Sequence, residues 1–335
     1  MQYRSLGSSG IQASAVGFGA WAIGGWMWGG ADETMAIRVI QTGIDIGINF
    51  IDTAPAYGFG ISEEILGKAI RGRRNKVVLA TKCGVVWHVE KGMHFFNSDR
   101  KHPRDDATEI KAYRYLAPES IRYEVEQSLK RLGVETIDLY QTHWQDPTTR
   151  IGDTMQELMR LQKEGKIQAI GVSNATPKEM DEYRKVGELA SDQEPYSMLD
   201  REHEKKNLPH CIDKGMAFLA YSPLAQGLLT GKVGPDRKFN EGDQRNTKER
   251  FGVEYRRKVT AMLEEYKWIA EDKGVTLAQL AIAWTIHQPG CTHALVGARN
   301  STQVAENAGA GDINLTSEEL QAMTKAIETH ASDLA

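Results

Sequence analysis

Several features that would point to a particular class of protein are scarce or missing in this chain of 335 residues. It has three cysteines, Cys83, Cys211 and Cys291, which are isolated and odd in number, so the sequence predicts neither a disulfide framework nor a zinc knuckle. No apolar run approaches the roughly 18 residues that a membrane-spanning helix needs. The amino-terminal segment MQYRSLGSSGIQ lacks the apolar core of a signal peptide, and we therefore expect a cytoplasmic protein.

Neither sign of charge is in large excess. The formal net charge is −4, with 41 lysine and arginine residues against 45 aspartate and glutamate residues. This balance argues against general binding to nucleic acids or to anionic membranes. Hydrophobic residues make up 41% of the chain and charged residues 26%, which is enough to bury a large core. We therefore expect a globular enzyme whose partners are small molecules.

Strand patterns and amphipathic helix patterns alternate along the chain after a candidate hairpin at residues 3–14. The expected strands cover residues 16–20, 48–52, 76–82, 137–143, 167–173, 192–196, 216–221 and 293–297. The expected helices cover residues 33–46, 62–70, 118–132, 153–164, 178–186, 208–214 and 301–309, with two further helical runs before the last strand. Eight such units predict an α/β fold, a (β/α)8 TIM barrel with an N-terminal β-hairpin and long βα loops, as one domain over residues 1–335.

A doubly wound sheet is the rival architecture. Its dinucleotide-binding form usually carries the glycine pattern G-x-G-x-x-G between the first strand and the first helix. Here the segment reads GFGAWAIG at 17–24, and its third glycine is misplaced. The tryptophans Trp21, Trp26 and Trp28 in this loop also suit the wall of a pocket better than a tight phosphate turn. The barrel is therefore the favoured prediction.

Two connections are longer than barrel loops usually are, at residues 83–117 and 222–251. Long loops that follow barrel strands open onto the active face of the barrel. Both segments are therefore candidate lids.

Three residues that suit proton transfer stand at the carboxyl ends of expected strands. Asp52 ends the second strand, Lys82 the third and His143 the fourth. Because these strand ends meet at one rim of a barrel, the side chains are expected to converge, with Tyr57 on the loop just beyond Asp52. Taken singly, these residues could equally be a helix cap, a solvated strand end, a core histidine and a packed ring. Their joint placement favours a catalytic group.

The chemistry of this group points to carbonyl reduction. A free phenol has a pKa of about 10, and we expect the Lys82 ammonium to lower the pKa of Tyr57. Asp52 would keep Lys82 charged and fixed, while a neutral His143 would donate a hydrogen bond to a substrate carbonyl oxygen. The carbonyl oxygen must gain a proton as the carbon gains hydride, and Tyr57 is the expected donor.

The motifs around these residues resemble those of the aldo-keto reductase superfamily, over nearly the whole chain. The specific signature is NFIDTAPAYG at 49–58, followed by SEEILG at 62–67. The segment ATK at 80–82 matches the family's lysine strand, and DLYQTHW at 138–144 matches its histidine strand. The chain resembles in particular the bacterial general-stress and sugar-type branch, which is related to the β subunits of potassium channels. The resemblance implies an NADPH-dependent reductase with Asp52, Tyr57, Lys82 and His143 as catalytic residues.

The resemblance also implies a set of cofactor contacts along the same rim. Near the nicotinamide and its ribose these are Gly19, Ala20, Trp21, Asp52, Ser173, Asn174, Gln193 and Tyr221, with Tyr221 stacked on the ring. Ser222, Leu224, Gln226 and Gly227 would follow the pyrophosphate, where Lys232 and Arg245 supply positive charge. Gly297, Arg299, Gln303, Glu306 and Asn307 would surround the adenosine. Arg299 stands where a 2′-phosphate would lie, which favours NADPH over NADH; a surface arginine near a helix start is the alternative.

Aromatic residues near the expected rim suggest the walls of a substrate pocket. The expected substrate contacts are Trp21, Tyr57, Trp87, His143 and Trp144, since such rings pack on apolar bodies and on the CH faces of sugars. A metal-dependent hydrolase on the same barrel would need several His or Asp ligands at strand ends, and Lys82 fits poorly among them. No metal site is expected.

The insertion at 83–117 bears on the substrate class. It combines the cations Arg100, Lys101, His102, Arg104, Lys111 and Arg114 with the rings of Trp87, Phe95, Phe96, Tyr113 and Tyr115. If it closes over the rim, it favours a small polar or sugar-derived carbonyl over a large apolar ketone; a solvated loop or an oligomer contact is the alternative. A regulatory or sensor protein that binds the nucleotide with little turnover is the other functional hypothesis, and the intact His143 argues against it.

Overall fold

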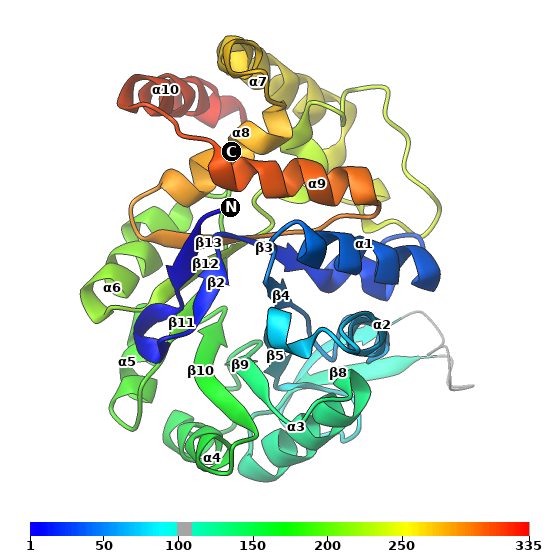
Figure 1. Ribbon diagram of the computed structural model, residues 1–335, viewed down its shortest axis with the longest axis vertical. Helices are drawn as coiled ribbons and strands as arrows, with labels where there is room; N and C mark the ends of the chain where they lie inside the picture. The colour runs from blue at the N-terminus through cyan, green and yellow to red at the C-terminus, as the bar shows by residue number, and fades with distance from the viewer. Residues whose placement is uncertain (99–108, 335) are drawn as a thin grey trace.

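A computed structural model describes residues 1–98 and 109–334, the last four of these by their backbone alone (Figure 1). Its centre is a closed barrel of parallel strands that follow one another around the barrel in chain order, with the last strand paired to the first. The strands are β3 (Val16–Gly19), β4 (Phe50–Asp52), β5 (Val78–Cys83), β9 (Ile137–Thr142), β10 (Ile167–Ser173), β11 (Ser191–Pro195), β12 (Ala217–Tyr221) and β13 (Cys291–Val296). The predicted (β/α)8 barrel is confirmed.

Helices surround the barrel, as Figure 1 shows. They are α1 (Glu33–Asp45), α2 (Ile61–Ala69), α3 (Pro118–Leu132), α4 (Ile151–Lys163), α5 (Pro177–Arg184), α6 (Asn207–Lys214), α8 (Leu277–His287) and α9 (Ser301–Gly309). Two further helices, α7 (Val253–Lys273) and α10 (Ser317–Leu334), pack against each other outside this ring. Among the described residues, none of the helices combines the length and the apolar character that a membrane crossing requires.

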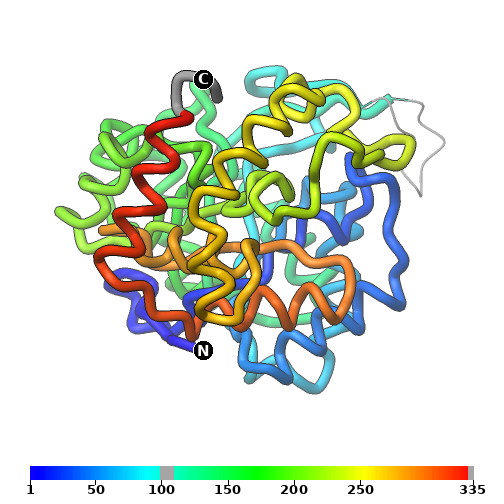
Figure 2. Tube along the Cα trace, turned by 90° about the horizontal axis from the view of Figure 1, so that it is seen from above, coloured from blue at the N-terminus to red at the C-terminus, as the bar shows by residue number. Residues whose placement is uncertain are grey.

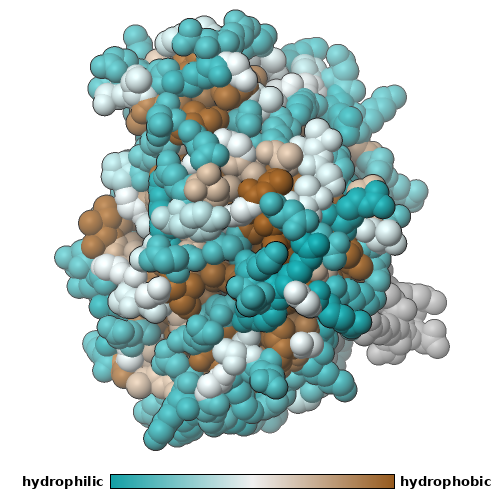
Figure 3. All heavy atoms as spheres, viewed as in Figure 1, coloured by the Kyte–Doolittle hydropathy of each residue, from teal (hydrophilic) through white to brown (hydrophobic). Residues whose placement is uncertain are grey.

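The sequence fixes where several helices begin. Thr176 starts α5 with a capping box, because its hydroxyl accepts from the backbone N–H of Glu179 while the Glu179 carboxylate accepts from the backbone N–H of Thr176. Thr276 and Gln279 form the same arrangement at the start of α8. On the face shown in Figure 3, apolar residues form small patches separated by hydrophilic side chains. The apolar faces of the helices are largely turned toward the barrel.

The N-terminal hairpin closes one end of the barrel. Strands β1 (Tyr3–Ser5) and β2 (Gln12–Ser14) pair antiparallel, as predicted. Leu6, between them, is fully buried in a cluster of barrel-interior side chains that includes Phe50 and Leu139. In Figure 2 the hairpin lies at the lower side of the view, and the segment that follows β5 lies at the opposite side. Of the two ends of the barrel, the hairpin therefore leaves the carboxyl ends of the strands open.

The segment at 83–117 is not a plain loop, and this corrects our interpretation. Three short strands within it, β6 (Val85–Val86), β7 (Met93–Ser98) and β8 (Ile110–Arg114), form an antiparallel sheet in the order β6-β8-β7. Local pattern did not reveal it, because β6 pairs with a strand more than 20 residues further along the chain. Arg100, Lys101, His102 and Arg104, expected to form part of a cationic lid, lie outside the described residues.

Candidate active site

A cleft of about 400 Å³ lies at the carboxyl ends of the barrel strands. It is lined by all of the predicted cofactor residues except Ser173, Asn174 and Gln193, that is, by Gly19, Ala20, Trp21, Asp52, Tyr221, Ser222, Leu224, Gln226, Gly227, Lys232, Arg245, Gly297, Arg299, Gln303, Glu306 and Asn307. Tyr57 and Trp28 line it as well. Residues far apart in the sequence thus share one elongated cavity.

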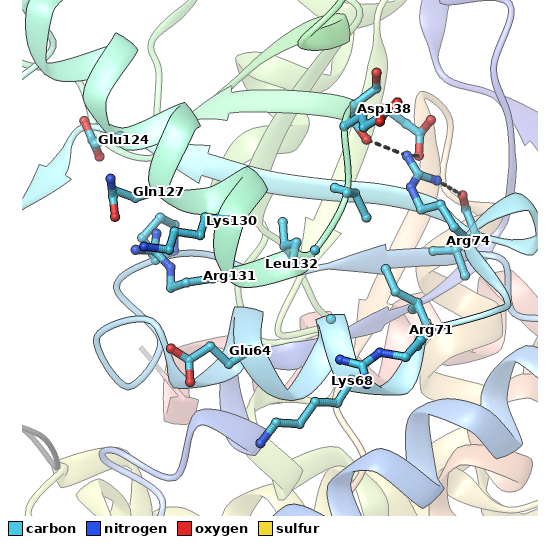
Figure 4. Close-up of a pocket in the computed structure, with 18 of the residues that line it drawn as sticks. Glu64, Lys68, Arg71, Arg74, Glu124, Gln127, Lys130, Arg131, Leu132 and Asp138 are labelled. Atoms are coloured by element: carbon cyan, nitrogen blue, oxygen red, sulfur yellow. Dashed lines mark hydrogen bonds and ion pairs between the residues drawn. The ribbon is translucent and has the colours of Figure 1, made fainter.

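A larger cavity of about 1370 Å³ lies outside the barrel, between α2 and α3 (Figure 4). Its cations are largely engaged by carboxylates, since Arg131 Nε lies 2.6 Å from Glu63 Oε2 and Arg74 Nη2 lies 2.8 Å from Asp138 Oδ2. None of the four predicted catalytic residues lines it. The smaller cleft is therefore the candidate active site.

Of the predicted substrate contacts, Trp21 and Tyr57 line the cleft, whereas His143, Trp144 and Trp87 do not. Trp87 lies elsewhere. It lines the outer cavity, and its ring packs edge-on against Phe59 with centroids 5.3 Å apart. It does not line the cleft. We expected Trp87 near the rim because it closely follows a strand end, but it comes directly after β6 and lies at the outer cavity.

The predicted catalytic residues are brought together. Lys82 Nζ donates to Asp52 Oδ2 at 2.6 Å and to the carbonyl oxygen of Thr53 at 3.0 Å. The same ammonium lies 3.4 Å from the Tyr57 hydroxyl. The Tyr57 ring meets the His143 ring edge-on, with centroids 5.7 Å apart. An ammonium, a phenol and an imidazole therefore face one region beside the cleft.

The electrostatics of the group differ from our expectation at one position. The pKa of Tyr57 lies well above its usual value, first because the phenol is buried and second because Asp52 repels the phenolate. We expected Lys82 to lower it. Burial also lowers the pKa of Lys82, although the nearby Asp52 carboxylate acts to raise it. The ammonium lies closer to Asp52, at 2.6 Å, than to the Tyr57 hydroxyl, at 3.4 Å. The phenol thus keeps its proton and is suited to donate it.

His143 is neutral, as expected. Its pKa lies well below the usual value, first because the imidazole is buried and second because the Lys82 cation lies nearby. A neutral imidazole retains one N–H that can be donated to a carbonyl oxygen.

Two glycines hold the loop that carries Tyr57. A Cβ on Gly24 would lie 2.6 Å from the Tyr57 carbonyl oxygen, and Gly58 has φ of +70° against the backbone of Gly24. Such close approach and positive φ need glycine at both positions. The turn after β3 and the turn after β4 thus rest on each other and fix the position of Tyr57.

The inner end of the cleft is bounded by amide and hydroxyl groups. Gln193 Nε2 donates to Asp52 Oδ1 at 2.9 Å, and Ser173 Oγ donates to the Gln193 carbonyl oxygen at 2.8 Å. Tyr221 donates to Asn174 Oδ1 at 3.0 Å, and Asn174 Nδ2 donates to the His143 carbonyl oxygen at 2.9 Å. The three predicted residues that do not line the cleft are therefore linked to those that do.

The backbone after β12 is shaped to receive an anion. Ser222, Ala225 and Gln226 have φ of +56°, +47° and +56°, and Gly227 follows with +104°. Positive φ at non-glycine residues costs energy and gathers at binding sites, and turns of this kind direct backbone N–H groups toward anions. This segment suits the diphosphate of a nucleotide.

Cations border the outer end of the cleft. Arg245 forms a two-point ion pair with Asp243, with Nη2 to Oδ2 at 2.7 Å, and Lys232 lies 3.0 Å from Glu306. Arg299 donates to the carbonyl oxygen of Trp28. The guanidinium groups of Arg245 and Arg299 stand 5.2 and 5.5 Å from the centroid of the Trp28 ring. The side chains present here fit the phosphates and adenosine of a nicotinamide dinucleotide.

The aromatic wall near the catalytic group comes partly from the inserted sheet. Phe95 on β7 packs against Trp144 with centroids 5.3 Å apart, and Phe96 stacks on Trp26 at 5.4 Å. The described cations of this sheet are already engaged, because Arg114 lies over the Phe95 ring and Lys111 contacts Glu90. The face that the described insertion turns to the rim is therefore aromatic.

The Aldo/keto reductase family matches residues 15–328 of the chain. The protein is an aldo-keto reductase. It is 39% identical over 336 residues to aldo-keto reductase YhdN of Bacillus subtilis (strain 168), covering 99% of this chain and 96% of that one. It is 41% identical over 329 residues to the NADH-specific methylglyoxal reductase of Escherichia coli (strain K12), covering 96% and 97%.

Solved structures of other aldo-keto reductases share the fold. The glycerol dehydrogenase AKR11B4 from Gluconobacter oxydans superposes with a TM-score of 0.86 at 40% identity, covering 98% of this chain and 95% of that one. An aldo-keto reductase from Klebsiella pneumoniae in complex with NADPH gives a TM-score of 0.72 at 27% identity, covering 97% and 95%. Carbonyl reduction is the chemistry that these relatives support for this aldo-keto reductase.

Sequence reasoning about this aldo-keto reductase missed two residues of the site. Asp243 holds Arg245 at the cleft, and nothing in the sequence marks it among the other acidic residues of its loop. Gln141 donates to Asp52 Oδ1 at 3.1 Å. Its signal was a polar residue near the end of a fully buried strand, two positions before His143.

Proposed function

We propose that this aldo-keto reductase reduces an aldehyde or ketone with NADPH, and that Tyr57 donates the proton. The observation that carries the proposal is the joint placement of Lys82, Asp52, Tyr57 and His143 beside a cleft whose other end is lined by cations. Bound NADPH would supply hydride to the carbonyl carbon. The carbonyl oxygen then takes the phenolic proton of Tyr57, so that one alcohol and one oxidised nicotinamide result.

Each residue of the group has a separate task. Tyr57, whose pKa is raised, keeps its proton until the oxygen becomes basic during hydride transfer. Lys82 lies 3.4 Å from the hydroxyl and stabilises the phenolate that remains. Asp52 fixes Lys82 at 2.6 Å, and neutral His143 donates a hydrogen bond that orients the carbonyl oxygen.

Residues along the cleft would hold the cofactor. Tyr221 would stack on the nicotinamide, with Asn174 and Gln193 at its carboxamide, and the turn of Ser222 to Gly227 would receive the diphosphate. We assign the 2′-phosphate of NADPH to Arg299, at the outer end of the cleft. The NADPH complex of the Klebsiella pneumoniae relative supports this choice, and the NADH-specific relative of Escherichia coli is the reason to test it.

For the substrate we propose a small polar or sugar-derived carbonyl. Two relatives are named for small polar molecules, methylglyoxal and glycerol. The rings of Trp21, Trp144 and Phe95 narrow the space near the catalytic group, which disfavours a bulky ketone. An aromatic wall also packs well on the CH groups of a short polyol.

The test follows the consumption of reduced nicotinamide with a panel of carbonyl compounds. Methylglyoxal, glyceraldehyde, a carboxylated aldehyde and a bulky aromatic ketone are compared by kcat/KM, each with NADPH and with NADH. We expect the small polar aldehydes to rank first. A preference for the bulky ketone would overturn the substrate class. Nucleotide binding without turnover on any compound would instead favour the regulatory alternative.

The same panel applied to a variant with β7 and β8 replaced by a short turn tests the inserted sheet. We expect the ranking to shift toward bulkier ketones, because Phe95 and Phe96 no longer wall the rim. An unchanged ranking would assign the insertion to structure or assembly.

A further inference from the structure

Gln141 occupies an unusual place in the barrel. It lies on β9, directly opposite Lys82 of β5 and Gly171 of β10 in the strand registers, and its side chain is fully buried. A Cβ on Gly171 would lie 3.0 Å from Gln141 Cγ, so glycine at this position leaves the side chain room. A buried amide needs partners, and those of Gln141 lie in the catalytic group.

Asp52 is surrounded by N–H donors on both of its oxygens. Oδ2 accepts from Lys82 at 2.6 Å, while Oδ1 accepts from Gln193 Nε2 at 2.9 Å and from Gln141 Nε2 at 3.1 Å. The Gln193 amide makes a second contact, from Nε2 to Gln141 Oε1 at 3.3 Å. Both amide hydrogens of Gln193 are thereby directed at two acceptors in the barrel interior.

This arrangement decides which way the Gln193 amide faces. A rotated amide would turn its oxygen toward the Asp52 carboxylate and would lose both hydrogen bonds. In the observed orientation, none of the described residues donates to Gln193 Oε1. That oxygen is the atom of Gln193 left to accept a hydrogen bond from a ligand.

We propose that Gln141 is a positioning residue that, together with Asp52, holds the Gln193 amide with its oxygen turned away from the Asp52 carboxylate and free to accept from a ligand bound beside Asp52, which lines the cleft. The site then selects a pyridine ring whose substituent carries an N–H donor, which is the amide group of nicotinamide. This role rests on the proposed function, because it concerns the binding of the same cofactor. It adds a residue that acts through Gln193 without touching the reacting atoms.

Substitution of Gln141 by methionine removes the acceptor for Gln193 and the donor to Asp52, while preserving the length of the side chain. One hydrogen of Gln193 Nε2 then has no interior acceptor, and leaving a buried donor unpaired is unfavourable. The amide can recover this loss by swinging that hydrogen toward an oxygen in the cleft. A ligand with a carbonyl oxygen but no N–H would then be bound almost as well as nicotinamide.

The probe is NADP⁺ compared with its 3-acetylpyridine analogue, in which a methyl ketone replaces the carboxamide. Dissociation constants are measured by quenching of tryptophan fluorescence, since Trp21 and Trp28 line the cleft. We expect the wild type to bind the analogue about tenfold more weakly, which corresponds to the loss of one hydrogen bond. In Gln141→Met, the ratio of the dissociation constant of the analogue to that of NADP⁺ should fall to about twofold or less.

Two further variants separate positioning from a general structural role. Gln141→Glu keeps an acceptor oxygen for Gln193 Nε2, and we expect it to retain the wild-type ratio even if its overall affinity is lower. Gln145→Met removes another buried glutamine of the same segment, which contacts Thr142 and Ser173 but neither Asp52 nor Gln193, and it should also retain the ratio.

The outcomes are distinguishable. An unchanged ratio in Gln141→Met, in a protein whose unfolding transition is intact, overturns the positioning role alone. If Gln141→Met does not fold, Gln141→Glu provides the test. A ratio lower than that of the wild type in Gln141→Glu would then overturn the positioning role. Failure of the wild type to bind either nucleotide overturns the proposed function together with this role.

Discussion

Lys82 and Asp52 form an ion pair in the interior of the barrel, with Nζ 2.6 Å from Oδ2 and side chains that are 1% and 4% exposed. Burial of two charges is costly, and an apolar pair of similar volume often gives equal or greater stability. The ammonium lies 3.4 Å from the Tyr57 hydroxyl, and it has to be held in place to stabilise the phenolate in the proposed mechanism. The pair is therefore best explained by the position it gives to the charge beside Tyr57.

Lys82→Met should lose carbonyl reduction and should also destabilise the protein. Asp52 would be left buried without its cation, which costs about 3–5 kcal/mol in the free energy of unfolding. The double variant Asp52→Asn with Lys82→Met should recover much of the stability but not the activity. Urea unfolding and steady-state kinetics measure the two effects. Lys68→Met, which removes a surface ion pair with Glu33, is the matched control and should cost at most about 1 kcal/mol.

Tyr57→Phe should lower kcat at least about 100-fold, because it removes the proton donor of the proposed mechanism. Nucleotide binding should be nearly intact, since the ring remains in place. Fluorescence titration with NADPH and steady-state kinetics test the two parts separately. Turnover within tenfold of the wild type would remove Tyr57 from its assigned role.

Gly24→Ala should lower kcat although Gly24 touches no reacting atom. The added Cβ would lie 2.6 Å from the Tyr57 carbonyl oxygen, so the Tyr57 loop has to move. A displacement of about 1 Å in a catalytic group can cost roughly 100-fold in rate. Gly234→Ala is the control, because a Cβ at Gly234 meets no atom within 4 Å. Equal kinetics for the two variants would show that the glycine contact does not set the position of Tyr57.

Arg299→Ala should weaken NADPH binding by about 1.5–3 kcal/mol and leave NADH binding unchanged, because a charge-assisted contact with the 2′-phosphate is lost. Dissociation constants for both nucleotides provide the measurement. Arg71→Ala, which changes a cation of the outer cavity, should affect neither. Equal losses for NADPH and NADH would show that Arg299 does not read the 2′-phosphate.

His293 should make the protein sensitive to acid. It is fully buried near the hairpin, and burial lowers its pKa to about 4. The depressed pKa means that the full stability is present above the unfolded pKa of about 6.5 and is lost as the pH falls toward 4, by about 3 kcal/mol. His293→Asn should lack this component in urea unfolding curves taken across that range.

The sequence predicted the barrel because its signals are local and repeated. Each strand is a short apolar run and each helix an amphipathic stretch, so that eight units can be recognised without knowing what they contact. The convergence of the proposed catalytic group was predictable for a related reason. Asp52, Lys82 and His143 each stand at a strand end, and closure of a parallel barrel brings such ends to one rim whatever the details of packing.

Other features were decided only by the tertiary structure, because they depend on which atoms meet across the barrel. The sheet β6-β8-β7 needs pairing between segments that lie apart in the sequence. The raised pKa of Tyr57 follows from its burial and from the nearby Asp52 carboxylate. The Lys82 ammonium lies closer to that carboxylate than to the phenol. Gln141 reaches Asp52 because the strand registers align them, and no local pattern along the chain carries that information.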